Sequence, residues 1–164
     1  MQLALEQARF ALESGEVPVG CIFYHLPSQT VVAKSHNLTN QTKNVYFHLL
    51  LNIKATTHCE INCINQLSNE NKINMIQECV LYVTVEPCLM CAHALNLVKI
   101  MKVKFGCEND KFGGNGSILS LNKFQNAGYQ VEQGILKNDA IKLLQQFYEH
   151  GNEKAPENKR QRKI

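Results

Sequence analysis

Long apolar segments are absent from this chain of 164 residues. No run reaches the roughly 20 apolar residues that a membrane-spanning helix needs, so we expect no membrane contact. The first residues, Met1 to Glu6, contain neither a basic cluster nor a long apolar stretch, so we also expect no secretory signal. Internal repeats and convincing linkers are missing too. The sequence therefore predicts one domain over residues 1–150, followed by a short tail over 151–164.

The chain has the composition of an ordinary soluble globular protein, with 45% hydrophobic and 19% charged residues. Its seven cysteines are an odd number, which does not suit a complete disulfide framework. Without an export signal, we expect reduced thiols and metal ligands instead. Three of them, Cys21, Cys63 and Cys79, lie in apolar runs and are expected in the core.

The basic residues are concentrated at the end of the chain. The net charge is +3, and the segment 151–164 carries this whole excess. A basic tail on a near-neutral body favours contact with a polyanion, although a solvated end without a partner has the same composition. The tail contains Lys154, Lys159, Arg160, Arg162 and Lys163 against Glu153 and Glu157.

The apolar pattern predicts alternating helices and strands. Thr57, Pro87 and Asp139 are expected to begin the last three helices. Strands connected by helices predict an α/β fold, with a central mixed sheet covered on both faces. The expected segments are a helix over 2–14, strands over 19–26 and 30–33, a helix over 58–67, a strand over 79–85, a helix over 87–98, a strand over 102–106 and a helix over 139–150.

Two short motifs carry the chemistry. His58 and Glu60 form an H-x-E motif, and Pro87, Cys88 and Cys91 form a P-C-x-x-C motif. Cysteines at i and i+3 of a first helical turn share one face, and the helix N-terminus favours the thiolate form that binds metal. We therefore predict a zinc ion on His58, Cys88 and Cys91. Three protein ligands leave a fourth position open for water.

A carboxylate that does not bind the metal completes this pattern. Glu60 is predicted to carry protons between the water and a departing amine, as a hydrolytic deaminase requires. The alternative is a closed structural zinc site, which needs a fourth ligand. His93 and Cys107 are the nearby candidates, but His93 is expected off the ligand face and Cys107 in the core.

The stretch from Leu81 to Cys91 resembles the catalytic subunits of the eukaryotic heterodimeric tRNA adenosine deaminases. The resemblance covers nearly the whole chain and extends to the segments 16–21, 40–44, 105–114 and the tail. It implies a cytidine-deaminase-like three-layer α/β/α sandwich. It also implies conversion of adenosine to inosine at the wobble position of tRNA anticodons, in the nucleus and cytoplasm. The partners that it implies are tRNA and a related, catalytically inactive deaminase subunit.

The resemblance also assigns roles to individual residues. His58, Cys88 and Cys91 match the zinc ligands, and Glu60 matches the proton carrier. Asn37 matches an asparagine that hydrogen-bonds the flipped nucleoside. RNA contacts are implied for the loop after 102–106 and for the tail, although Phe112 could equally be a buried core residue. These contacts are Lys111, Phe112, Lys159, Arg160, Arg162 and Lys163.

Two features depart from the family pattern. Cys59 stands where the H-x-E motif usually has alanine, next to the pocket. Ten residues, 45–54, interrupt a stretch that is continuous in the family, and they are strongly apolar. We interpret them as a lineage-specific loop or as a segment missing from the mature product. An intact-mass measurement on protein from its native source decides between the two.

Two other functions compete with this one. A deaminase of free nucleotides, such as deoxycytidylate, uses the same chemistry, but it needs neither a basic tail nor the loop around Phe112. A zinc-stabilised RNA-binding scaffold needs no Glu60. Inosine formation on tRNA by the purified heterodimer separates the three.

Overall fold

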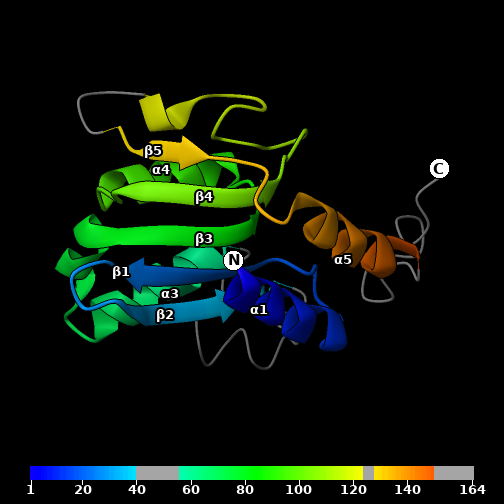
Figure 1. The fold of residues 1–164 in the computed structure, drawn as a ribbon, viewed down its shortest axis with the longest axis horizontal. Helices are drawn as coiled ribbons and strands as arrows, with labels where there is room; N and C mark the ends of the chain where they lie inside the picture. The colour runs from blue at the N-terminus through cyan, green and yellow to red at the C-terminus, as the bar shows by residue number, and fades with distance from the viewer. Residues whose placement is uncertain (40–55, 124–127, 150–164) are drawn as a thin grey trace.

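The computed structural model describes residues 1–39, 56–123 and 128–149. A five-stranded sheet with the order β2-β1-β3-β4-β5 forms its centre (Figure 1). The elements are α1 (Gln2–Glu13), β1 (Gly20–His25), β2 (Thr30–His36), α3 (Cys59–Asn69), the 3₁₀ helix η2 (Ile73–Glu78), β3 (Cys79–Val85), α4 (Leu89–Leu97), β4 (Lys102–Cys107), the 3₁₀ helix η3 (Leu121–Lys123), β5 (Gln130–Glu132) and α5 (Lys137–Glu149).

The sheet is mixed, as predicted. Strand β1 runs antiparallel to β2 and to β3, whereas β4 and β5 run parallel to β3. In the register, Phe23 of β1 pairs with Leu81 of β3, and Val83 of β3 pairs with Phe105 of β4. Strands β2, β3 and β4 therefore end at one edge of the sheet, where open α/β sheets place their functional sites.

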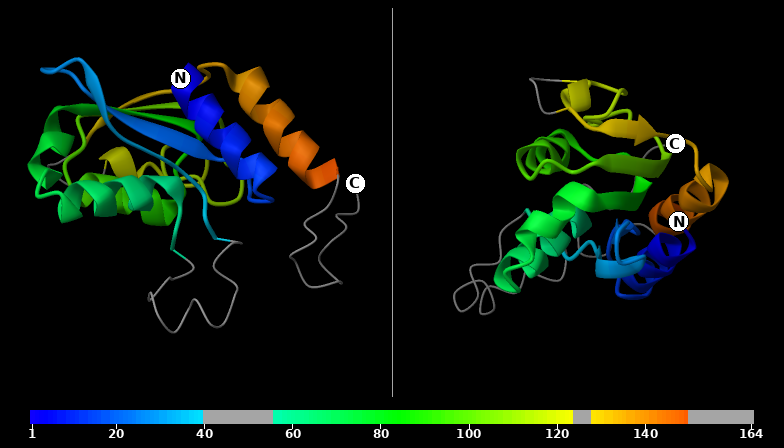
Figure 2. Two further views of the ribbon diagram at one scale, coloured as in Figure 1. Left: turned by 90° about the horizontal axis from the view of Figure 1, so that it is seen from below. Right: turned by 60° about the vertical axis from the view of Figure 1, so that its left-hand side comes forward.

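Helices cover both faces of the sheet, which confirms the predicted three layers. Helices α1 and α5 lie on one face and α3 and α4 on the other (Figures 1 and 2). Alternate residues of each strand point to opposite faces, so each face has its own apolar core. The larger core, toward α3 and α4, includes Phe23, Leu81, Val83, Phe105 and the predicted core cysteines Cys21, Cys63 and Cys79.

The second core lies toward α1 and α5 and includes Leu5, Ala8, Ala140, Leu143 and Cys107. The backbone of α1 approaches the sheet closely at Gly20, where a Cβ atom would lie 2.4 Å from the carbonyl oxygen of Ala4. Glycine therefore begins β1, because a side chain at this position would push α1 off the sheet.

The helix boundaries correct three details of the sequence prediction. Thr57 does not cap α3, because His58 holds the N-cap position with an extended backbone. Pro87 lies outside α4, whose N-cap is Cys88. Helix α5 begins at Lys137, so Asp139 lies in its first turn instead of capping it. A sequence pattern defines a helix start only to within one or two residues, which is why these three starts were misplaced.

Three short elements were not predicted: the strand β5 and the 3₁₀ helices η2 and η3. Strand β2 also continues to His36, beyond the expected 30–33. Among the described residues, no helix is long and apolar enough to cross a membrane. The segment 45–54 and the tail 151–164 lie outside the described residues, so both of these predictions stay untested.

Candidate active site

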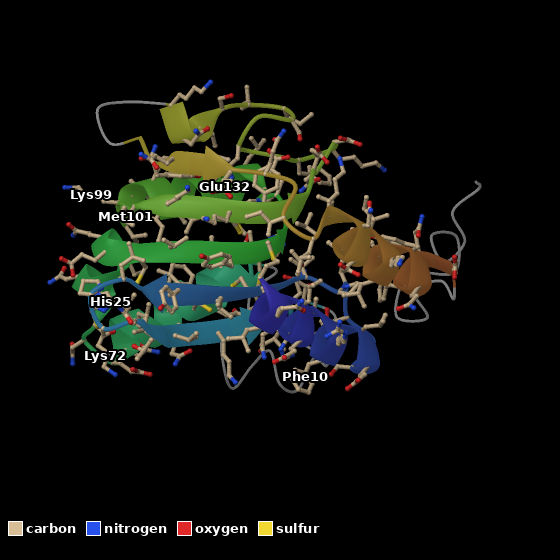
Figure 3. The ribbon with its side chains drawn as sticks, viewed as in Figure 1. Phe10, His25, Lys72, Lys99, Met101 and Glu132 are labelled. Carbon is tan, nitrogen blue, oxygen red and sulfur yellow. The ribbon has the colours of Figure 1, made fainter. Side chains whose placement is uncertain are left out.

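Two helices bring the predicted zinc ligands together at the edge where β2 and β3 end. His58 is the N-cap of α3, which follows β2 in the chain. Cys88 is the N-cap of α4 and follows β3 by three residues, and Cys91 lies in the first turn of that helix. Figure 3 labels His25, Lys99 and Met101 at the opposite end of the sheet, where β3 and β4 begin. The predicted convergence of the two helix starts is therefore confirmed.

The three ligand atoms have the spacing that a tetrahedral zinc ion requires. Nδ1 of His58 lies 3.5 Å from Sγ of Cys88 and 3.6 Å from Sγ of Cys91. With Zn–S bonds of about 2.3 Å and Zn–N bonds of about 2.0 Å, tetrahedral geometry places nitrogen and sulfur roughly 3.5 Å apart. All three ligand atoms lie within 4.8 Å of one another. One imidazole and two thiols therefore fit a zinc ion in both spacing and chemistry.

No fourth side chain joins this cluster in the described ranges 1–39, 56–123 and 128–149. His93 is exposed on α4. Cys107 is buried on β4, where its thiol donates to the carbonyl oxygen of Thr84 at 3.7 Å. Neither residue takes the role of a closing ligand that a structural zinc site would need. The arrangement fits a three-ligand site with an open position.

Glu60 lies beside the cluster without being one of its members. It occupies the first turn of α3, two residues after His58, and only 3% of it is exposed. The thiol of Cys59 donates to Oε2 of Glu60 at 3.3 Å. Burial, assisted by the nearby Cys88, raises the pKa of the Glu60 carboxyl group, although its own backbone N–H and His58 act in the opposite direction. A raised pKa brings a carboxyl group closer to the range in which it both accepts and releases protons.

The thiols of the cluster also have perturbed pKa values. The hydrogen bond from Cys91, assisted by His58, lowers the pKa of Cys88 to about 4 despite partial burial. The same Cys88–Cys91 bond, together with burial, raises the pKa of Cys91. Hydrogen bonding to Cys88 raises the pKa of His58. Without a metal, Cys88 is thus the thiolate, and it accepts hydrogen bonds from Cys91 and His58. A metal ion that binds to all three groups displaces protons from Cys91 and His58.

Asn37 connects the end of β2 to the helix that carries His58 and Glu60. It is buried, and its Oδ1 accepts a hydrogen bond from the backbone N–H of Cys59 at 3.2 Å. Its own backbone N–H donates to the carbonyl oxygen of Val19. This bond to α3 holds the side chain of Asn37 in place, and its Nδ2 group is a hydrogen-bond donor.

A cavity of about 420 Å³ opens beside the cluster. Its lining includes His58, Glu60, Cys88 and Asn37, so it joins the metal cluster to the predicted substrate-binding residue. Lys111 and Phe112 also line it, and both are exposed. Phe112 is 62% exposed, so the alternative that it is buried in the core is wrong. The other predicted RNA contacts, Lys159, Arg160, Arg162 and Lys163, lie outside the described residues.

Sequence reasoning missed several residues of this cavity. Leu144 and Tyr148 reach it from α5, and Glu86 and Asn109 reach it from the segments after β3 and β4. The sequence contained one signal for Glu86, a carboxylate directly before the P-C-x-x-C motif at the end of an apolar strand. It contained none for α5, because only the folded chain shows that this helix borders the site.

Fold and site together define the class of protein. The family model of the MafB19-like deaminases matches residues 1–147. The chain therefore belongs to this deaminase family, and its relatives place it among the tRNA-specific adenosine deaminases.

The relatives support this placement over nearly the whole chain. It is 39% identical to the tRNA-specific adenosine deaminase 2 of Xenopus laevis, covering 99% of this chain and 92% of that protein. It is also 39% identical to the tRNA-specific adenosine deaminase subunit tad2 of Schizosaccharomyces pombe, but it spans 40% of that longer protein. A tRNA-specific adenosine deaminase of Streptococcus pyogenes is 30% identical and matches 94% of this chain and 91% of that protein.

Solved structures agree on the fold. One comes from biochemical and structural studies of A-to-I editing by tRNA:A34 deaminases at the wobble position of transfer RNA. It superposes with a TM-score of 0.73 at 28% identity and covers 88% of this chain and 97% of its own. The guanine deaminase of Nitrosomonas europaea superposes with a TM-score of 0.69 at 16% identity, covering 89% of this chain and 81% of its own, and shares the fold.

Proposed function

We propose that this chain is the catalytic subunit of a heterodimeric deaminase that converts adenosine to inosine at the wobble position of tRNA anticodons. The observation that carries the proposal is the cluster of His58, Cys88 and Cys91, with the buried carboxylate of Glu60 next to it. The relatives named tRNA-specific adenosine deaminase supply the substrate.

The donor set suits zinc, because two thiols and one imidazole at tetrahedral spacing are typical zinc ligands. His58, Cys88 and Cys91 would hold the zinc ion, which would act as a Lewis acid and lower the pKa of a water molecule to about 7. Cys59, Glu60 and Cys91 are buried on the protein side of the site, while the cavity gives access from the side of the half-buried His58 and Cys88.

The side chains of the protein transfer protons and orient the base in this reaction. Glu60 takes one proton from the attacking water and delivers it to the ring nitrogen of the base. It then takes the second proton from the added hydroxyl group and gives it to the amine, so that ammonia leaves and a carbonyl group remains. Burial suits this task because a carboxyl group with a raised pKa exchanges protons more readily near neutrality. Asn37 orients the base by donating from Nδ2 while its Oδ1 stays on α3.

The substrate enters at the mouth of the cavity in this proposal. Lys111 and Phe112 are exposed there, where a cation and an aromatic ring suit a phosphate and a stacked base. The basic tail adds phosphate contacts in this proposal. The word subunit in the name of one relative supports a second chain in the assembly. We propose that this second chain is a related deaminase subunit without catalytic activity, and that the complex acts in the nucleus and cytoplasm.

The test is inosine formation on tRNA by the chain purified together with its partner. We expect the wild-type complex to convert the wobble adenosine. Glu60→Gln should abolish turnover, while zinc content and tRNA affinity stay unchanged. Conversion that persists in Glu60→Gln would contradict the role of this residue. Activity on deoxycytidylate or guanine but not on tRNA would instead identify a deaminase of small molecules.

A further inference from the structure

Glu86 is a buried carboxylate that the proposed chemistry does not use. It directly follows β3 and precedes Pro87 and Cys88, and 2% of it is exposed. A buried carboxylate is costly unless hydrogen bonds compensate for the lost water. The partners of Glu86 therefore indicate what the residue does.

The carboxylate of Glu86 accepts hydrogen bonds from one loop, 109–117, which follows β4. Oε2 accepts from the backbone N–H of Asn109 at 3.0 Å, and Oε1 accepts from the backbone N–H groups of Asn115 at 2.8 Å and of Ser117 at 3.2 Å. The hydroxyl group of Ser117 also donates to Oε2. One side chain thus binds the loop near its beginning and near its end.

The loop wraps tightly around the carboxylate, so a side chain at Gly113 would displace Glu86 from its donors. A Cβ atom on Gly113 would lie 2.5 Å from Oε2 of Glu86. The backbone N–H of Gly114 donates to the carbonyl oxygen of Pro87 at 2.9 Å, and that of Leu89 donates to the carbonyl oxygen of Phe112 at 2.8 Å. The loop is therefore attached to the turn that carries Cys88.

The tip of this loop forms one wall of the cavity. Asn109, Asp110, Lys111 and Phe112 line it, and they lie between the two points that Glu86 holds. Since Lys111 and Phe112 are exposed, their own side chains contribute little to fixing their position. The buried carboxylate behind the loop holds both ends of this segment, in addition to the backbone hydrogen bonds at Phe112 and Gly114.

We propose that Glu86 is a positioning residue that fixes the loop 109–117 at the mouth of the site and thereby sets how tightly the chain binds its RNA substrate. The inference rests on the proposed function for the identity of the ligand. Glu86 touches neither the reacting atoms nor the metal ligands in this role. It acts on substrate affinity through Lys111 and Phe112.

The test compares Glu86→Gln with Glu78→Gln in the full chain, loaded with zinc and bound to its partner. These two glutamates flank β3, and the side chain of Glu78 is 63% exposed, so the second variant controls for the loss of one carboxylate. Glutamine keeps the size of Glu86, but its amide nitrogen cannot accept a hydrogen bond. The readouts are zinc content, hydrogen exchange of the loop amides, the affinity for a fluorescent anticodon stem-loop, and KM and kcat.

We expect Glu86→Gln to keep its zinc and to exchange the amides of Asn109, Asn115 and Ser117 faster. The Kd and KM for RNA should rise by about fivefold, which is less than the full loss of a hydrogen bond to a charged group because the backbone bonds of the loop remain, while kcat changes by less than about twofold. Ser117→Ala, which removes one donor and leaves the carboxylate in place, should shift exchange and Kd in the same direction but less. Glu78→Gln should match the wild type.

The proposal is overturned if the loop amides exchange faster but the Kd for RNA stays at the wild-type value. It is also overturned if zinc is lost in step with RNA affinity, because Glu86 would then support the metal-bearing helix. Should Glu86→Gln fail to fold, Ser117→Ala decides alone through the same two readouts. A wild-type complex that binds the RNA but forms no inosine would refute the proposed function and leave this inference intact.

Discussion

The thiol of Cys59 donates a hydrogen bond to Oε2 of Glu60 over 3.3 Å. Cys59 is fully buried, and burial raises the pKa of its thiol to about 12, so it remains a donor throughout the neutral range. The residue that departs from the family pattern thus contacts the residue that is proposed to move protons. Its larger side chain is accommodated in the core next to Cys21 and Cys63.

Removal of this thiol should slow turnover without abolishing it. Cys59→Ala deletes one donor to the carboxylate, and we expect kcat for inosine formation to fall by about fivefold, as for the loss of about 1 kcal/mol. Cys63→Ala is the matched control, because Cys63 is equally buried on α3 and contacts Cys21 instead of Glu60. Equal losses in the two variants would show that packing, and not the hydrogen bond, determines the effect.

Zinc binding should depend on the three clustered side chains and on no other described histidine or cysteine. We expect Cys88→Ala to lose the bound metal, whereas His93→Ala and Cys107→Ala retain about one zinc ion per chain. Because Cys88 raises the pKa of His58, protons should compete with the metal as the pH falls. Elemental analysis after dialysis at decreasing pH measures both effects. Zinc loss in His93→Ala would revive the closed four-ligand site.

The tail should contribute to RNA affinity through charge alone. Replacing Lys159, Arg160, Arg162 and Lys163 with alanine should weaken tRNA binding and lower the slope of log Kd against log salt by up to about 3. The slope is measured from titrations at several salt concentrations, with inosine formation under saturating tRNA as the control for an intact active site. An unchanged slope would assign the basic residues to a solvated end without a role.

The short edge strand β5 should be stabilised by charge in a pH-dependent way. Glu132, labelled in Figure 3, pairs with Lys102 at 2.8 Å and Lys104 at 3.0 Å on β4. These lysines lower the pKa of Glu132, so its contribution to stability is present above the pKa of the unfolded chain, about 4.3, and is lost as the pH falls through the lower folded value.

Glu132→Gln should therefore lower the urea midpoint slightly at pH 7, and this difference should shrink as the pH falls through the lowered pKa of Glu132, where the wild-type side chain becomes neutral. Salt at about 1 M should reduce the difference at pH 7, because the pair lies on the surface. A difference that persisted at low pH would point to packing of the side chain instead of its charge.

Periodicity and motif spacing predicted the elements that carry the site. The continuous apolar run of β3 and the i, i+3 spacing of Cys88 and Cys91 were sufficient to place these thiols, since both patterns are local. Strand β5 has three residues and no alternation to detect, and its partner β4 lies more than 20 residues away in the chain. The exposure of Phe112 could not be predicted from the sequence either, because a phenylalanine after a strand occurs both in apolar cores and at the edges of cavities.

The role of Glu86 could not be predicted from the sequence either. Its carboxylate is compensated by donors 23 to 31 positions further along the chain, and no local pattern records such a connection. The position of Asn37 in the cavity was predicted through the resemblance, whereas its bond to the backbone of Cys59 came from the structure alone.

The direct succession of Glu86, Pro87 and Cys88 restricts how this part of the chain can vary in length. Glu86 anchors the loop, and Cys88 belongs to the metal cluster. A deletion or insertion between these two residues would therefore uncouple the position of the loop from that of the cluster. Lengthening of the chain between 109 and 117 would likewise separate amides that must reach the same carboxylate. Natural variation in loop length should therefore begin after Ser117, toward η3 and β5, where these anchors end.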